Sequence, residues 1–141
     1  MPASLIRFQK EENLDFSFKE KESTIKWILK VIRKEGKKSG DLLYFFCTDH
    51  YLLEVNKKFL GHNTYTDIIT FDYSTAEKIS GEIYISIDRV KENAKNYKQP
   101  FNKELKRVLI HGVLHLCGYP DKTESQKTKM RAKEAYALSL F

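Results

Sequence analysis

Residues 111–121 read HGVLHLCGYPD and combine the end of a helix with two histidines and an aspartate. His111 and His115 are four residues apart, so on a helix they lie about 40° apart around the axis and one turn apart along it. Both imidazoles can therefore reach one metal ion. Gly118 is suited to a left-handed helix cap, and the proline two residues later prevents further helix. The chain must turn there, which can bring Asp121 back towards the histidines.

These side chains form the ligand set of a catalytic zinc site: two imidazole nitrogens, one carboxylate and an open fourth position. We therefore predict that His111, His115 and Asp121 bind one Zn²⁺, or another divalent ion, and act in catalysis through it. A closed structural site is not expected, because Cys117 lies about 200° around the helix from His115. Two alternatives stay open. The histidine pair is a half-buried helix face, or Asp121 caps the next helix in the capping-box pattern Asp121-Lys-Thr-Glu124.

Three blocks of the sequence resemble a known family. HGVLHLCGY at residues 111–119 resembles the signature of the YbeY family of ribosomal-RNA maturation endoribonucleases. Val-Asn at 55–56 and Thr-Asp-Ile-Ile-Thr-Phe at 66–71 look like the family's Leu-Asn and Thr-Asp-Val-Leu-Ser-Phe, at the same spacing. Gly-Glu-Ile-Tyr-Ile-Ser at 81–86 looks like its Gly-Asp-Ile-x-Ile-Ser. The resemblance covers roughly residues 42–121, over half of the chain.

The chain departs from the family pattern at two positions. The family signature continues with Asp-His, and that histidine is the third zinc ligand. Here the residues are Pro120-Asp121, so the resemblance implies that Asp121 is the third ligand. Leu60 stands where the family usually carries an arginine implicated in contact with RNA or phosphate. Some other cation must take that role.

The resemblance implies a single-strand-specific, metal-dependent endoribonuclease that acts in ribosomal-RNA maturation, including processing of the 16S rRNA 3′ end, and in ribosome quality control. It implies an rRNA precursor as substrate and the ribosome or ribosomal proteins as partners. One alternative is a zinc peptidase or other zinc hydrolase, although Gly112 occupies the place of the catalytic glutamate of His-Glu-x-x-His peptidases. Another is a non-catalytic, ribosome-associated metal-binding protein.

Length and composition indicate one charged domain. The 141 residues predict one domain, 1–141. The net charge of +6 attracts polyanions such as nucleic acid, and a lysine-rich solvated surface is an equally good explanation of it. No apolar run is long enough to span a membrane, and the first residues lack a signal-peptide layout, so we expect a cytoplasmic protein without a membrane partner. Cys47 and Cys117 are expected to be free thiols.

The hydrophobic pattern predicts an α/β (α+β) fold with the order β-α-β-α-β-β-α-α-α. A mixed sheet of about four strands is expected to pack with about five helices. The predicted strands are 4–8, 42–47, 66–73 and 82–87, with loops at 37–40 and 74–80. The continuous apolar run at 42–47 indicates a strand buried on both faces. The predicted helices are 24–35, 49–59, 88–97, 102–116 and 123–140.

Two further residues are candidates for substrate contact. His62 lies in a polar loop, where it can approach a phosphate or simply remain solvated. Asp67 begins the strand 66–73 and is a candidate general base, as are Asp72 and Glu82. For each carboxylate the alternative is a structural hydrogen bond at a strand end or turn.

Overall fold

The computed structural model describes residues 6–141, and the predicted order of elements is confirmed. The strands are β1 (Ile6–Lys10), β2 (Lys38–Cys47), β3 (Ile68–Asp72) and β4 (Lys78–Ser86). The helices are α1 (Lys21–Lys34), α2 (Asp49–Val55), α3 (Ile87–Asn96), α4 (Phe101–Leu116) and α5 (Glu124–Ser139), and a π-helical turn, η1 (Asn56–Leu60), continues α2. Residues 4 and 5 of the predicted first strand lie outside the described residues.

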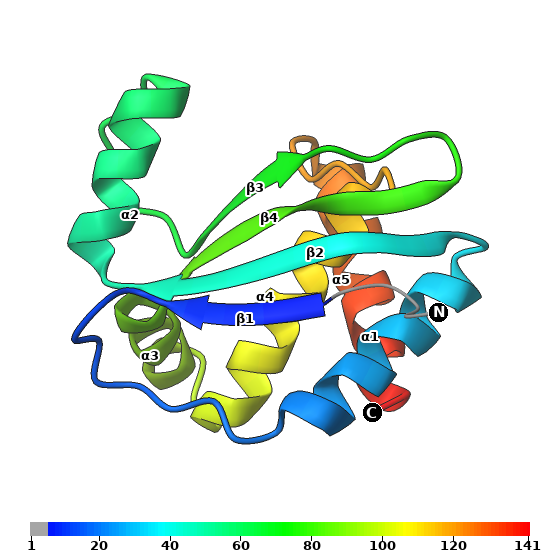
Figure 1. Cartoon of the computed structure of the whole chain (residues 1–141), viewed down its shortest axis with the longest axis horizontal. Helices are drawn as coiled ribbons and strands as arrows, with labels where there is room; N and C mark the ends of the chain where they lie inside the picture. The colour runs from blue at the N-terminus through cyan, green and yellow to red at the C-terminus, as the bar shows by residue number, and fades with distance from the viewer. Residues whose placement is uncertain (1–5) are drawn as a thin grey trace.

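The four strands form one mixed sheet in the order β1-β2-β4-β3. β1, β2 and β4 run parallel to one another, whereas β3 pairs antiparallel with β4. Figure 1 shows α1, α3, α4 and α5 gathered on one side of the sheet, while α2 projects from the other side near one end. β3 is therefore an edge strand, and α4 packs beneath it.

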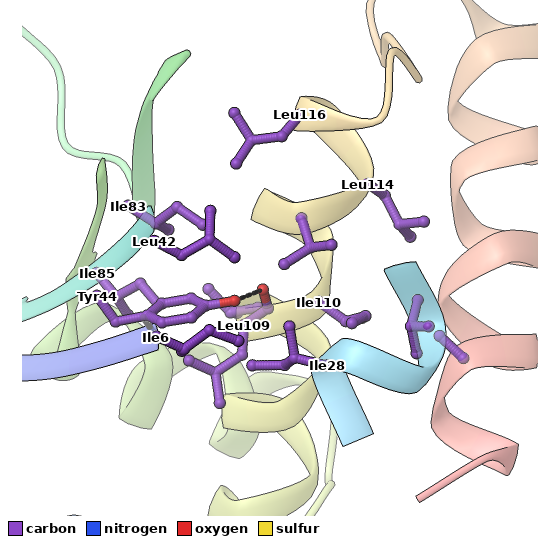
Figure 2. Packing of buried hydrophobic residues seen from close by; sticks show 14 of the residues in the cluster. Ile6, Ile28, Leu42, Tyr44, Ile83, Ile85, Leu109, Ile110, Leu114 and Leu116 are labelled. Atoms are coloured by element: carbon purple, nitrogen blue, oxygen red, sulfur yellow. Dashed lines mark hydrogen bonds between the residues drawn. The ribbon is translucent and has the colours of Figure 1, made fainter. Parts of the chain in front are cut away.

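The main core lies between the sheet and α4. Figure 2 shows Leu109 and Leu116 of α4 directed towards Leu42 and Ile83 of the central strands. The hydroxyl of Tyr44, which is fully buried, donates a hydrogen bond of 2.9 Å to the backbone carbonyl of Leu109. This bond satisfies a polar atom that would otherwise be costly inside the core. α4 is thus anchored to the sheet along its length.

Gly112 allows α4 to approach the sheet closely. A Cβ at this position would lie 2.9 Å from Cγ2 of Ile83 and 3.2 Å from Cδ1 of Ile68. Both isoleucines belong to the strands nearest the candidate ligands, β4 and β3. The close approach therefore places the residues on either side of Gly112 next to the free edge of the sheet.

The prediction that residues 42–47 are buried on both faces is wrong. Tyr44 and Phe46 are buried under the helices, but Leu43 and Phe45 point to the other face and are half-buried. Helices cover only one face over most of the sheet. On the other face, α2 shields a small cluster that includes Cys47 and Leu52. A continuous apolar run therefore indicates a strand buried on both faces only where a second layer of structure covers the second face of the sheet.

Two predicted loops are partly strand. β2 begins at Lys38 and β4 at Lys78, and these polar ends pair in parallel with each other before an irregularity between Ser39 and Leu42 shifts the register. The strand propensity of the residues does not predict these strand ends, because backbone hydrogen bonds between neighbouring strands can hold polar residues in a sheet. Cys47 and Cys117 are free thiols, as predicted. None of the helices described has both the length and the apolar character needed to cross a bilayer.

Candidate metal centre

The three side chains predicted as metal ligands meet at the C-terminal end of α4. His111 and His115 lie on successive turns, with ring centroids 4.5 Å apart, and Asp121 approaches from the turn after the helix. Oδ2 of Asp121 lies 3.3 Å from Nε2 of His111 and 3.5 Å from Nε2 of His115. One ligand atom from each residue lies within 4.8 Å of the other two. This group could bind a metal ion.

The two separations between Asp121 and the histidines fit a tetrahedral centre. Zinc bonds of about 2.0–2.2 Å to nitrogen or carboxylate oxygen place two ligand atoms about 3.3–3.6 Å apart at the tetrahedral angle. A direct N–H···O hydrogen bond is shorter, at about 2.9–3.0 Å. The observed contacts of Asp121 with His111 and His115 therefore match a shared cation better than direct hydrogen bonds.

A buried carboxylate orients His111. Nδ1 of His111 lies 2.5 Å from Oε2 of Glu134, which is on α5 and only 4% exposed. Burial alone would raise the pKa of Glu134, but its hydrogen bond to His111 and the charge of Arg107 lower the pKa below the usual value. Glu134 is therefore an ionised acceptor, and Nδ1 of His111 is the donor. This leaves the lone pair of Nε2 free to face Asp121 and a metal.

His115 is oriented by backbone instead. Its Nδ1 donates a hydrogen bond of 2.9 Å to the carbonyl oxygen of Tyr119, in the turn after α4. Gly118, with φ of +105°, supplies the left-handed residue that makes this turn. Burial and the neighbouring charge of His111 lower the pKa of His115, although Asp121 acts in the opposite direction. His115 is thus favoured in its neutral form, which is the form that binds a metal.

Arg107 links the site to two further carboxylates, of which Glu104 is buried and Asp67 is half-buried. Its guanidinium donates two hydrogen bonds to Glu104, at 3.0 and 2.8 Å, and one to Glu134 at 3.2 Å. Asp67 lies 3.7 Å from the same guanidinium. Four carboxylates and one guanidinium therefore surround the histidines: Asp67, Glu104, Asp121, Glu134 and Arg107. This excess of negative charge favours a bound divalent cation.

Asp67 is held by this network, away from the larger hollow described below. Asn93 of α3 donates a hydrogen bond of 3.3 Å to its carboxylate, and Arg107 lies on its other side. Burial raises the pKa of Asp67 above the usual value for an aspartate, and the positive charges of Arg107 and His111 offset only part of that rise. A role for Asp67 in substrate contact stays a prediction.

The capping role considered for Asp121 is wrong. α5 begins at Glu124, and Thr123 is its N-cap: the Thr123 hydroxyl accepts a hydrogen bond from the backbone N–H of Gln126. The side chain of Gln126 accepts in return from the N–H of Thr123, which completes a capping box. Asp121 lies two residues before the cap, so its carboxylate is free to approach His111 and His115.

A hollow of about 710 Å³ adjoins His115 along the free edge of β3. The predicted contact residue His62 lines it, as do Asp72 and Leu60, which stands at the family's arginine position. Glu82 is not among the residues that line this hollow, and its carboxylate accepts a hydrogen bond from the hydroxyl of Tyr84. Of the residues described around this hollow, Lys122 is the single lysine or arginine. The lining of this hollow mixes polar and apolar side chains and carries little charge.

The sequence model described as Endoribonuclease YbeY matches residues 6–141. The chain belongs to this family. An Endoribonuclease YbeY of Flavobacterium psychrophilum is 52% identical over 97% of this chain and 96% of its own length. One of Phocaeicola vulgatus is 46% identical over 97% of this chain and 99% of its own. A solution structure of a Thermotoga maritima protein shares the fold, with a TM-score of 0.68 and 27% identity over 96% of this chain and 88% of its own.

Membership of the YbeY family supports an endoribonuclease role in ribosomal-RNA maturation, and the peptidase alternative is not favoured. The group of His111, His115 and Asp121 is consistent with a metal-dependent nuclease of this family.

The residues that orient the ligands, chiefly Glu134 and Arg107, were not predicted from the sequence. A signal was present for both. Glu134 is a charged residue four positions after buried Met130, on the face of α5 that packs inward. Glu104, Arg107 and His111 follow the same helical spacing on α4. Charged residues on an otherwise buried face indicate mutual pairing, but the sequence does not give the partner.

Proposed function

We propose that this chain cuts phosphodiester bonds within single-stranded segments of an rRNA precursor, with a divalent cation held by His111, His115 and Asp121. The convergence of the three ligand atoms within 4.8 Å, with both separations from Asp121 at tetrahedral spacing, carries the proposal. Zn²⁺ is the cation that this donor set fits best, since two imidazoles and a carboxylate with an open fourth position are typical of catalytic zinc.

The metal, when bound, polarises the phosphodiester and lowers the pKa of a coordinated water. The protein residues supply positioning. Glu134 and the Tyr119 carbonyl fix the tautomers of the two histidines, so that both Nε2 atoms face the same point. Because both histidines lie on a helix packed along its length against the sheet, the ligands are held in place before substrate arrives.

The larger hollow supports an RNA substrate. It lies beside His115, and its volume of about 710 Å³ falls within the range of pockets that hold small-molecule ligands, roughly 300–1,000 Å³. Threonine hydroxyls and the exposed ring of Tyr65 line it. Such groups suit the stacking and hydrogen bonding by which proteins hold unpaired nucleotides. We propose that His62 contacts RNA there.

The cellular setting belongs to the same proposal. We place the single domain 1–141 in the cytoplasm, where it acts with the ribosome or ribosomal proteins, including at the 3′ end of 16S rRNA. The net charge of +6 favours such a polyanionic partner.

The test is cleavage of labelled single-stranded RNA by the zinc-loaded protein and by a His111→Ala variant. We expect cleavage by the wild type, loss of cleavage on chelation, and loss in His111→Ala. The matched control is His50→Ala, which removes an exposed histidine on α2 and should leave cleavage unchanged. Cleavage that persists in His111→Ala, or intact RNA with the loaded wild type, contradicts the proposal.

A further inference from the structure

A second, smaller hollow adjoins the metal centre. It has a volume of about 200 Å³ and is lined by His111 and Asp121 together with Lys127 and Arg131 of α5. It shares no lining residue with the larger hollow beside His115. The three candidate ligands therefore lie between two separate depressions of the surface.

We propose that the smaller hollow is a phosphate-binding subsite, in which Lys127 and Arg131 hold the RNA backbone on one side of the bond that is cut. This inference rests on the proposed endoribonuclease function. An enzyme that cuts inside a chain must accommodate substrate on both sides of the reacting phosphate. One hollow alone would hold only one of the two flanking segments.

The spacing of residues on α5 places these cations beside the centre. Lys127, Met130, Arg131 and Glu134 follow the i, i+3, i+4, i+7 pattern of one helix face. Met130 and Glu134 are buried against α4, and Glu134 contacts His111. The two cations share that face but are exposed, so they lie at its rim, where a ligand can reach them.

The two cations are available for a ligand, unlike other cations nearby. Arg107 also lines this hollow, but it is engaged by Glu104 and Glu134. Lys133 is engaged by Glu35 at 3.2 Å. Arg131, by contrast, pairs with no carboxylate in residues 6–141, and the nearest acidic contact of Lys127 is a highly exposed Glu124 at 4.0 Å. An RNA phosphate would give both cations a partner.

The contrast between the hollows indicates a division of roles. The larger has room for nucleosides and carries Lys122 as its single lysine or arginine among the described lining residues. The smaller lies below the usual size of a small-molecule pocket, and its charged lining comprises three cations and two carboxylates: Arg107, Lys127, Arg131, Asp121 and Glu134. Glu134 is held by His111 and Arg107, and Asp121 faces the two histidines, so the carboxylates do not pair with Lys127 or Arg131. The smaller hollow therefore suits the compact, charged phosphate rather than a base, and its recognition is independent of sequence.

The test measures binding of a fluorescent, 2′-O-methylated single-stranded RNA, which resists cleavage through its 2′ position, over a series of salt concentrations. The variants are Lys127→Gln, Arg131→Gln and the double variant. The control pair is Lys129→Gln with Lys30→Gln. Lys129 lies on the same helix but faces the ring of Tyr119, and Lys30 lies on α1; both are outside the two hollows.

Each phosphate contact contributes about 0.7 to the slope of log affinity against log salt for a single strand. We expect the magnitude of this negative slope to decrease by about 0.7 in each single variant and by about 1.4 in the double variant. The control double variant has the same net charge and should keep a slope close to that of the wild type. A double variant that matches its control overturns the proposed subsite.

Cleavage of unmodified RNA by the same proteins separates this inference from the function on which it rests. If the wild type cleaves RNA and the double variant binds like its control, the subsite is wrong and the nuclease stands. If the slopes change as expected but the wild type does not cleave, Lys127 and Arg131 bind RNA phosphate, but the proposed cleavage at this metal centre, and with it the subsite's place beside a cut bond, is wrong.

Discussion

The two sides of α4 are held by different forces. One side carries Leu105, Leu109 and Val113 into the core beneath the sheet, where packing is apolar and non-directional. The other side carries Arg107 and His111, whose positions depend on directional contacts with α5 and with the turn after α4. The apolar side therefore sets where the helix lies, while the polar side sets which atoms of the histidines face the metal.

The largest effect on stability is expected from the apolar side. Leu109→Ala removes a fully buried side chain and leaves a cavity, so unfolding should require about 2–5 kcal/mol less free energy. Because the polar side is untouched, the metal affinity of the folded protein should change little. Denaturant unfolding and a metal titration measure the two quantities separately. A large loss of metal affinity in the folded variant would show that the two sides are not separable.

The next largest effect should come from Asp121, which acts on the metal with little effect on the fold. Asp121→Ala removes one of the three proposed ligands, so metal affinity should fall by more than about 100-fold. The carboxylate is half-buried and caps no helix, so the stability of the fold should change little. Asp121→His restores the ligand of the family signature and should retain metal. Competition with a chelating dye measures both variants. Equal metal content in Asp121→Ala and wild type would remove Asp121 from the site.

Glu134→Ala tests the directional contacts. It removes the acceptor for Nδ1 of His111, so metal affinity should fall by about 10–100-fold. It also leaves the buried side of Arg107 short of a partner, which should cost about 1–3 kcal/mol of stability. Glu134→Gln keeps one acceptor oxygen and should lose less on both measures. Unchanged metal affinity in both variants would show that packing alone orients His111.

The smallest effect is a pH dependence of the metal-free protein. The pKa of His115 is lowered by burial and by His111, so below about pH 6.5 the unfolded chain takes up a proton at this residue before the folded protein does. Stability should therefore fall as the pH drops from about 7.5 to about 5.5, and less steeply in His115→Gln. Thermal unfolding with a chelator present provides the measurement. Identical pH profiles for the two proteins would contradict the shift.

The difference between the two sides also explains what the sequence could predict. The leucines and valines of α4 recur with helical spacing, so the helix, its buried side and the order of all elements follow from the pattern. His111, His115 and Asp121 were found because they lie close together in the chain and the turn between them is marked by Gly118.

The contacts that orient the ligands could not be predicted in the same way. Glu134 is 23 residues from His111 on a separate helix, and only the packing of α5 on α4 brings the two together. The capping of α5 by Thr123 rather than Asp121 was decided by Gln126, whose side chain closes the capping box. One face of the sheet is covered by few helices, and this depends on where the helices pack. The hydrophobic pattern of a single strand does not contain that information.

His111, His115 and Asp121 are proposed to hold the catalytic metal, and anomalous diffraction at the zinc absorption edge, from crystals grown with zinc, locates that ion. We expect an anomalous peak about 2.0–2.2 Å from Nε2 of His111, Nε2 of His115 and Oδ2 of Asp121. Zinc bound only at other residues, or no peak between these three side chains, would contradict it.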